Sequence, residues 1–171
     1  MIKPQDIIVA LFSCLDAPSL SFAEKAQALG MSASEVHAAE RRLIEARLLN
    51  SADHSIKKKA FLDFLVHGVP YAFAVAPKEM TRGMPTAWGA PVLSDKFAVS
   101  NQPLPVWPDA NGDVQGVAVK PLYRSAAKAA QNNPALYELL ALVDALRIGR
   151  ARERKLAETL IKERLASHAT A

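Results

Sequence analysis

Five residues between Ser32 and Arg47 have the types and the spacing needed to contact a nucleic acid. An arginine can donate two hydrogen bonds to a guanine edge or bind a phosphate, and serine and histidine can hydrogen-bond to bases or phosphates. A small residue among them lets the backbone approach closely. If Val36, Ala39 and Leu43 face the interior of the protein, the outward residues of the same helix are Ser34, His37, Ala38, Arg41 and Arg42. The alternative is an ordinary solvated face, with the two arginines pairing locally with Glu45.

Two S-x-x-E patterns mark the starts of the helices that would position these residues. Ser21 precedes Glu24 and Ser32 precedes Glu35 by three residues, as in a capping box. Gly30 lies between the two patterns and suits a sharp turn at positive φ. The sequence therefore predicts a helix from Ser21, a turn at Gly30 and a second helix over residues 32–47.

Small and branched residues recur around this turn at the offsets that a helix-turn-helix needs. Ala26, Gly30 and Val36 have this spacing, and a helix over about residues 4–16 precedes them. The polar stretch "SADH" leaves room for a short wing before another amphipathic helix. The pattern over about residues 4–68 resembles the winged helix-turn-helix domain of MarR-like bacterial transcriptional regulators. The resemblance implies a helix that reads the major groove of double-stranded DNA.

Three lysines follow the expected wing. Ammonium groups at the start of a helix oppose its dipole, and a nearby phosphate would relieve that repulsion. We therefore add Lys57, Lys58 and Lys59 to the candidate DNA contacts, with a solvated basic patch as the alternative.

The remainder of the chain predicts a mainly α fold with a small β component. Prolines exclude long helices from residues 69–133, where "YAFAVA" and "GVAVKPL" are typical of short strands and Asn111-Gly112 suits a type I′ hairpin turn. The helix expected over residues 134–148 is apolar on nearly every face, which indicates burial between other elements or between subunits. We therefore divide the chain into a winged helix-turn-helix domain (1–68), a Pro-rich β/loop region (69–133) and a C-terminal helical, oligomerisation region (134–171).

A rigid segment in the middle region offers a second candidate site. Glycine and proline fix the backbone of "TRGMPTAWGAP", and the tryptophans provide flat apolar faces. This suits a loop that binds a ligand or a protein, although simple core packing is the alternative for both tryptophans. The residues concerned are Arg82, Thr86, Trp88 and Trp107.

Other kinds of chemistry lack support in the sequence. The formal charge of +4 is too small to demonstrate a polyanion partner. Cys14 stands alone and the four histidines are scattered, so neither a disulfide framework nor a metal site is expected. We find no nucleophile elbow, phosphate-binding loop or dinucleotide fingerprint, and we expect neither a cofactor, catalytic residues nor enzymatic activity. No leader or membrane-spanning run is evident, so we expect a cytoplasmic protein with no membrane partner.

Three functions fit these features. The leading hypothesis is a sequence-specific DNA-binding transcriptional regulator that acts as a homodimer, with helix 32–47 in the major groove of double-stranded DNA. The alternative is a protein-interaction module, such as an antitoxin or adaptor, in which the winged helix is structural and another protein is the partner. A third hypothesis adds an effector pocket near Trp88 and Trp107.

Overall fold

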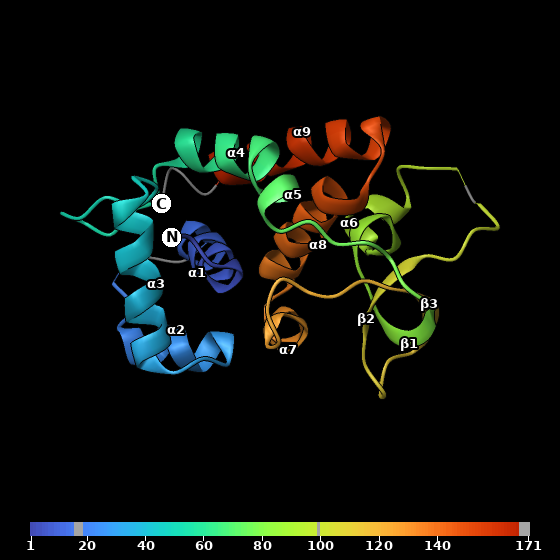
Figure 1. Cartoon of the computed structure of the whole chain (residues 1–171), viewed down its shortest axis with the longest axis horizontal. Helices are drawn as coiled ribbons and strands as arrows, with labels where there is room; N and C mark the ends of the chain where they lie inside the picture. The colour runs from blue at the N-terminus through green and yellow to red at the C-terminus, as the bar shows by residue number, and fades with distance from the viewer. Residues whose placement is uncertain (16–18, 99, 168–171) are drawn as a thin grey trace.

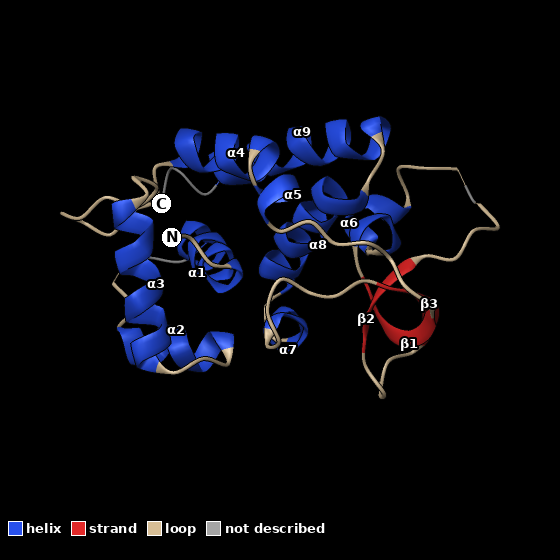
Figure 2. Cartoon of the chain, viewed as in Figure 1, coloured by secondary structure: helices blue, strands red, loops and turns tan. Residues whose placement is uncertain are grey.

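The computed structural model describes residues 1–15, 19–98 and 100–167, and shows a mainly helical chain with a small sheet (Figure 2). The sheet lies at one end of the molecule and helices form the remainder (Figure 1). The predicted fold class, mainly α with a small β component, is therefore confirmed.

The N-terminal three helices begin and end close to where the capping signals predict. They are α1 (Pro4–Leu15), α2 (Phe22–Leu29) and α3 (Ala33–Glu45). Ser21 and Ser32 each accept a hydrogen bond from the backbone three residues on, and Glu35 completes a capping box by accepting from the Ser32 N–H. Gly30 has φ 67°, in the left-handed region that a residue with a side chain rarely adopts. The helix, turn and helix are confirmed, with α3 ending two residues earlier than expected.

A protruding loop joins α3 to α4 (Lys58–His67). Leu49 and Ile56 form an isolated antiparallel bridge at its base, and residues 50–55 extend away from the body of the protein (Figure 1). Arg47 and His54 both have positive φ, at 63° and 57°, which turns the chain sharply two residues before each partner of the bridge. The stretch expected to form a wing is thus a loop closed by one pair of residues.

The middle region contains three strands, but they differ from those predicted. The segment "YAFAVA" is not a strand, because α5 (Val69–Ala72) starts at a proline-stabilised turn and an irregular loop follows. The strands are β1 (Met80–Pro85), β2 (Pro105–Pro108) and β3 (Val114–Ala118), so only the start of "GVAVKPL" is extended. A short 3₁₀ turn (Ala87–Gly89) and α6 (Pro91–Ser94) lie between β1 and β2.

The predicted type I′ hairpin turn is wrong. A hairpin needs antiparallel neighbours, whereas β2 and β3 pair in parallel and both pair antiparallel with β1. A type I′ turn also needs positive φ at both central residues, and neither Asn111 nor Gly112 has it. The unexpected strand β1 is possible because Gly83 has no side chain. A Cβ atom there would lie 1.9 Å from the Trp107 carbonyl oxygen.

The C-terminal helices are α7 (Ala126–Gln131), α8 (Pro134–Ile148) and α9 (Ala151–Ser167). The bounds predicted for α8 are confirmed, and Asn133 caps it by accepting a hydrogen bond from the Leu136 N–H. Residues 139–146 of α8 are all buried within this chain. Of the two alternatives for α8, the structure shows burial between elements of the same chain, because α1, α9 and the middle region cover its apolar surface. The oligomerisation role of residues 134–171 stays a prediction.

One hydrophobic cluster runs from Ile7 to Leu165 and takes residues from all three predicted segments. Among the helices that the structure describes, none is long and apolar enough to cross a membrane.

Candidate nucleic-acid interface

The exposed face of α3 carries four of the five residues predicted for that helix. Val36, Ala39 and Leu43 are fully buried against the neighbouring helices, as the apolar spacing predicts. Ser34, His37 and Arg41 are consequently exposed, and Ala38 is half-buried between them. The helix α3 lies at the edge of the molecule from which the 50–55 loop protrudes (Figure 1).

Arg42 lies elsewhere. Its Nε atom donates a hydrogen bond of 2.8 Å to one carboxylate oxygen of Asp6 on α1, and its Nη2 atom donates another of 2.8 Å to the second oxygen. Asp6 is completely buried, and the hydrogen bond that it accepts raises the pKa of the Arg42 guanidinium. The structure thus assigns Arg42 to the packing of α3 on α1, whereas Arg41 faces solvent. One residue along a helix turns a side chain by about 100°, which is enough to separate the two arginines.

His37 is exposed but held in position. Its ring meets the ring of Phe22 on α2 edge-on, with centroids 5.1 Å apart. Edge-to-face packing fixes an aromatic side chain without covering both of its polar atoms. His37 can therefore present a hydrogen-bonding nitrogen at a defined place on the exposed face.

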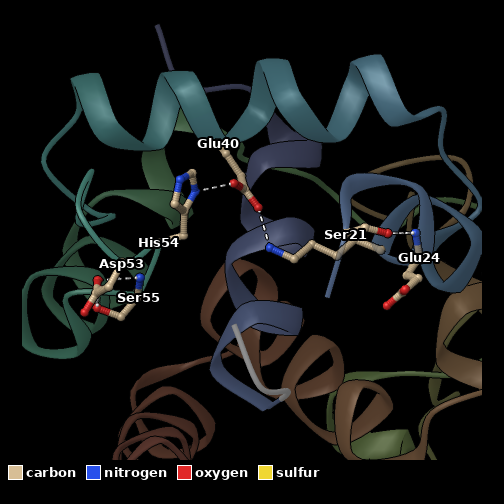
Figure 3. Close-up of polar contacts among 7 residues, drawn as sticks. Ser21, Glu24, Glu40, Asp53, His54 and Ser55 are labelled. Carbon is tan, nitrogen blue, oxygen red and sulfur yellow. Dashed lines mark hydrogen bonds and ion pairs between the residues drawn. The ribbon is translucent and has the colours of Figure 1, made fainter. Parts of the chain in front are cut away.

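An ionic cluster that the sequence analysis missed ties α2, α3 and the 50–55 loop together (Figure 3). The Lys25 Nζ atom lies 2.6 Å from one oxygen of Glu40, and the His54 Nδ1 atom lies 2.8 Å from the other. Lys25 and Glu40 are both buried. A signal exists in the sequence, because Glu40 falls between Val36 and Leu43 on the apolar stripe, where a charged residue needs a buried partner. The cluster holds the 50–55 loop and α2 against α3.

Within the loop, Asp53 accepts hydrogen bonds from the Ser55 N–H and hydroxyl groups (Figure 3). These bonds lower the pKa of the Asp53 carboxyl. The tip of the loop is therefore a defined turn.

The three lysines after the loop divide into two groups. Lys57 and Lys59 are exposed. Lys58 is half-buried, and its Nζ atom donates a hydrogen bond of 2.8 Å to the Leu165 carbonyl near the end of α9. A cation at that end of a helix is favourable, so Lys58 joins α4 to α9, whereas Lys57 and Lys59 remain available to a phosphate.

The first turn of α3 contacts the segment before α7, which the sequence analysis also missed. The Tyr123 hydroxyl donates a hydrogen bond of 2.6 Å to Glu35, and an Arg124 nitrogen lies 3.6 Å from the same carboxylate oxygen. Bonds from the Ser32 backbone and from Tyr123 hold the pKa of Glu35 below its usual range. No short-range pattern links Glu35 to Tyr123, 88 residues later, so only the fold brings Tyr123 and the neighbouring Arg124 to the candidate interface.

The residues of the second candidate site do not converge on a pocket. Arg82 is exposed on β1, and Trp88 is half-buried against the core. Thr86 and Trp107 are buried, and both donate hydrogen bonds of 2.7 Å to Asp144 on α8. Burial raises the pKa of the Asp144 carboxyl, although these two bonds and the ion pair with Arg147 act to lower it. This network joins the sheet to α8, and Trp107 is a core residue.

Neither of two hollows on the protein surface is lined by these residues. One, of about 390 Å³, lies under the 50–55 loop, and the other, of about 180 Å³, lies between α6 and α8. In the part of the chain that the structure describes, no three His, Cys, Asp or Glu side chains are grouped to hold a metal ion.

Comparisons with known proteins add no information, because no protein-family model matches the chain and no similar curated protein or solved structure was found.

Proposed function

We propose that this protein is a sequence-specific DNA-binding transcriptional regulator in which α1, α2, α3 and the 50–55 loop act as a winged helix-turn-helix domain. One observation carries the proposal. The left-handed turn at Gly30 sets α3 across α2 with Ser34, His37 and Arg41 exposed, beside a protruding loop. A recognition helix and a wing on the same side of the domain are the arrangement that winged helices use on DNA.

The exposed side chains suit contact with a duplex. The major groove, about 12 Å wide, admits a helix, and Arg41 can donate two hydrogen bonds to a guanine edge. His37 lies about one turn, and Ser34 about two turns, nearer the start of α3, where they can reach neighbouring bases. Lys57 and Lys59, at the base of the loop, are placed to bind backbone phosphates.

We further propose that the protein acts in the cytoplasm as a homodimer on a palindromic operator. Two recognition helices about 34 Å apart would read successive turns of the same groove. Because α8 is buried in its own subunit, the contact between subunits must use another surface. The proposal requires no catalytic step, cofactor or metal.

The test begins with selection from a library of random duplexes, because the operator is unknown. The wild-type protein should enrich a palindromic site, and binding to that site, followed by fluorescence anisotropy, should weaken steeply with salt. Arg41→Ala should lose about 1–3 kcal/mol of discrimination at one base pair in each half-site. Arg152→Ala, an exposed arginine on α9, is the control and should leave the preference unchanged. Failure of the wild type to enrich any sequence would refute the proposed function.

A protein-interaction module, such as an antitoxin or adaptor, is the second candidate. Two observations favour it: Arg41 shares the exposed side of α3 with Glu45, so the face has little net positive charge, and Tyr71 on α5 is 74% exposed. Exposed aromatic side chains are enriched at protein interfaces. If the wild type enriches no DNA sequence, Tyr71→Ala would be the first variant to test against candidate protein partners.

A further inference from the structure

Arg124 occupies an unusual position beside the first turn of α3. Its guanidinium lies over the ring of Tyr123, with its central carbon 5.0 Å from the ring centroid. The Tyr123 hydroxyl is in turn bonded to Glu35. The Arg124 side chain is nevertheless 77% exposed. A long, flexible cation is thus held at one end of the candidate recognition helix while its charged head faces solvent.

The hydrogen-bond donors of Arg124 are uncommitted. At 3.6 Å its contact with Glu35 is an electrostatic attraction and too long for a hydrogen bond. Both Glu35 oxygens already accept short bonds, of 2.7 Å from the Ser32 N–H and of 2.6 Å from Tyr123. Within the part of the chain that the structure describes, Arg124 donates no hydrogen bond. Its planar fork of donors therefore suits an incoming phosphate.

The C-terminal half of the chain holds the segment that carries Arg124. Val119 and Leu122 are buried, and the Lys120 carbonyl accepts a hydrogen bond from Arg147 in the network around Asp144. On the other side, Ser125 packs against the turn of the helix-turn-helix, where a Cβ atom added to Gly30 would lie 3.2 Å from the Ser125 Cβ atom. Arg124 is fixed relative to α3 from both directions.

Cations then lie at both ends of the exposed face of α3. The helix has 13 residues and is about 20 Å long at 1.5 Å per residue. Arg124 lies beside its first turn, whereas Lys57 follows the loop at its other end (Figure 1). Phosphates line both edges of the major groove, so a helix in the groove needs positive charge on each side.

We propose that Arg124 binds a backbone phosphate of the duplex that α3 enters, so that the C-terminal half of the chain supplies one edge of the DNA interface. This inference rests on the proposed function and deepens it. Tyr123 is the positioning residue, because it stacks against the guanidinium and is anchored to Glu35.

The test compares Arg124→Ala, Arg124→Lys and Arg152→Ala on the DNA site selected by the wild type. Arg152 is a matched control because its guanidinium also lies over an aromatic ring, that of Phe97, at 5.1 Å. It is on the first turn of α9, far from α3 (Figure 1). Anisotropy titrations from 50 to 200 mM salt measure the slope of log affinity against log salt. The melting temperature of each variant verifies that it is folded.

Loss of one phosphate contact should reduce the magnitude of the slope by about 0.9. The advantage of the wild type over Arg124→Ala should therefore shrink about 3.5-fold over this fourfold change in salt. Arg124→Lys should keep most of the slope because it keeps the charge, and Arg152→Ala should match the wild type. The preferred sequence should be the same for all variants, since a phosphate contact carries no base information.

A slope for Arg124→Ala equal to that of the wild type would overturn the inference and leave the proposed function intact. A changed sequence preference with an unchanged slope would also overturn it, since Arg124 would then contact a base. Failure of the wild type to select any DNA would overturn both proposals.

Discussion

We expect replacement by alanine to have opposite effects at the neighbouring residues Arg41 and Arg42. Arg42→Ala removes two of the three hydrogen bonds that the buried Asp6 carboxylate accepts, and leaves only the bond of 2.8 Å from the Lys3 N–H. Arg41→Ala removes an exposed side chain that donates no hydrogen bond within the described residues. We therefore expect Arg42→Ala to destabilise the fold and Arg41→Ala to affect DNA binding alone.

The size of the effect on stability follows from the geometry. A hydrogen bond to a charged group contributes about 1.5–3 kcal/mol to stability, so two of them set a range of about 3–6 kcal/mol. The Arg42 side chain is 19% exposed, so water can reach the Asp6 carboxylate after truncation and the lower end applies. A loss of about 3 kcal/mol in a chain of 171 residues lowers the melting temperature by about 8 °C.

The assay is thermal unfolding of the wild type, Arg41→Ala, Arg42→Ala, Asp6→Asn and the double variant Asp6→Asn/Arg42→Ala. Arg41→Ala should melt within about 1 °C of the wild type, as surface substitutions usually do. The double-mutant cycle should give a coupling energy of at least about 1.5 kcal/mol between Asp6 and Arg42. Well below its melting temperature, Arg42→Ala should bind the selected DNA within about threefold of the wild type, because it makes no proposed contact.

Two results would refute this reasoning. A melting temperature for Arg42→Ala within about 1 °C of the wild type would mean that the Asp6 pair contributes nothing in solution. An equal loss of stability in Arg41→Ala would mean that α3 is rotated from the orientation described here.

Three further predictions concern other groups. Burial raises the pKa of the Cys14 thiol to about 12, so the folded protein should not react with a thiol reagent at about pH 8. The thiol should react only when the protein unfolds, and rapid modification of the native protein would contradict this. The pKa of Glu35 is below its usual value in the folded protein, so its stabilising contribution is present above about pH 4.5 and is lost as pH falls through the folded pKa. The difference in melting temperature between the wild type and Glu35→Gln should shrink from about pH 6 to pH 3, and a constant difference would show that the charge of Glu35 is irrelevant. Asp144→Ala should lower the free energy of unfolding by about 3–5 kcal/mol, because Arg147 and the Trp107 Nε1–H lose a buried partner. Urea unfolding followed by tryptophan fluorescence measures this loss, and a loss below about 1 kcal/mol would contradict the hydrogen-bond network around Asp144.

Local chemistry made the helices of the N-terminal region predictable. Ser32 with Glu35 and the freedom of Gly30 at positive φ act over three or four residues, so they are visible in the sequence. The middle region was predicted poorly for the opposite reason. Strand β1 depends on Gly83 lying against the Trp107 carbonyl, and that contact spans 24 positions of the chain.

The residues of the candidate interface were likewise predictable only in part. The apolar stripe of α3 alone determined that Ser34, His37 and Arg41 face outward, because helical periodicity fixes which residues share a face. Only the tertiary structure decided that Arg42 pairs with Asp6, that Lys58 joins α9, and that Arg124 lies beside the first turn of α3. The two residues of each pair are far apart in the chain: 36 positions for Asp6 and Arg42, 107 for Lys58 and Leu165, and 89 for Glu35 and Arg124. A charged side chain selects its partner by distance in space, which the order of residues does not encode locally.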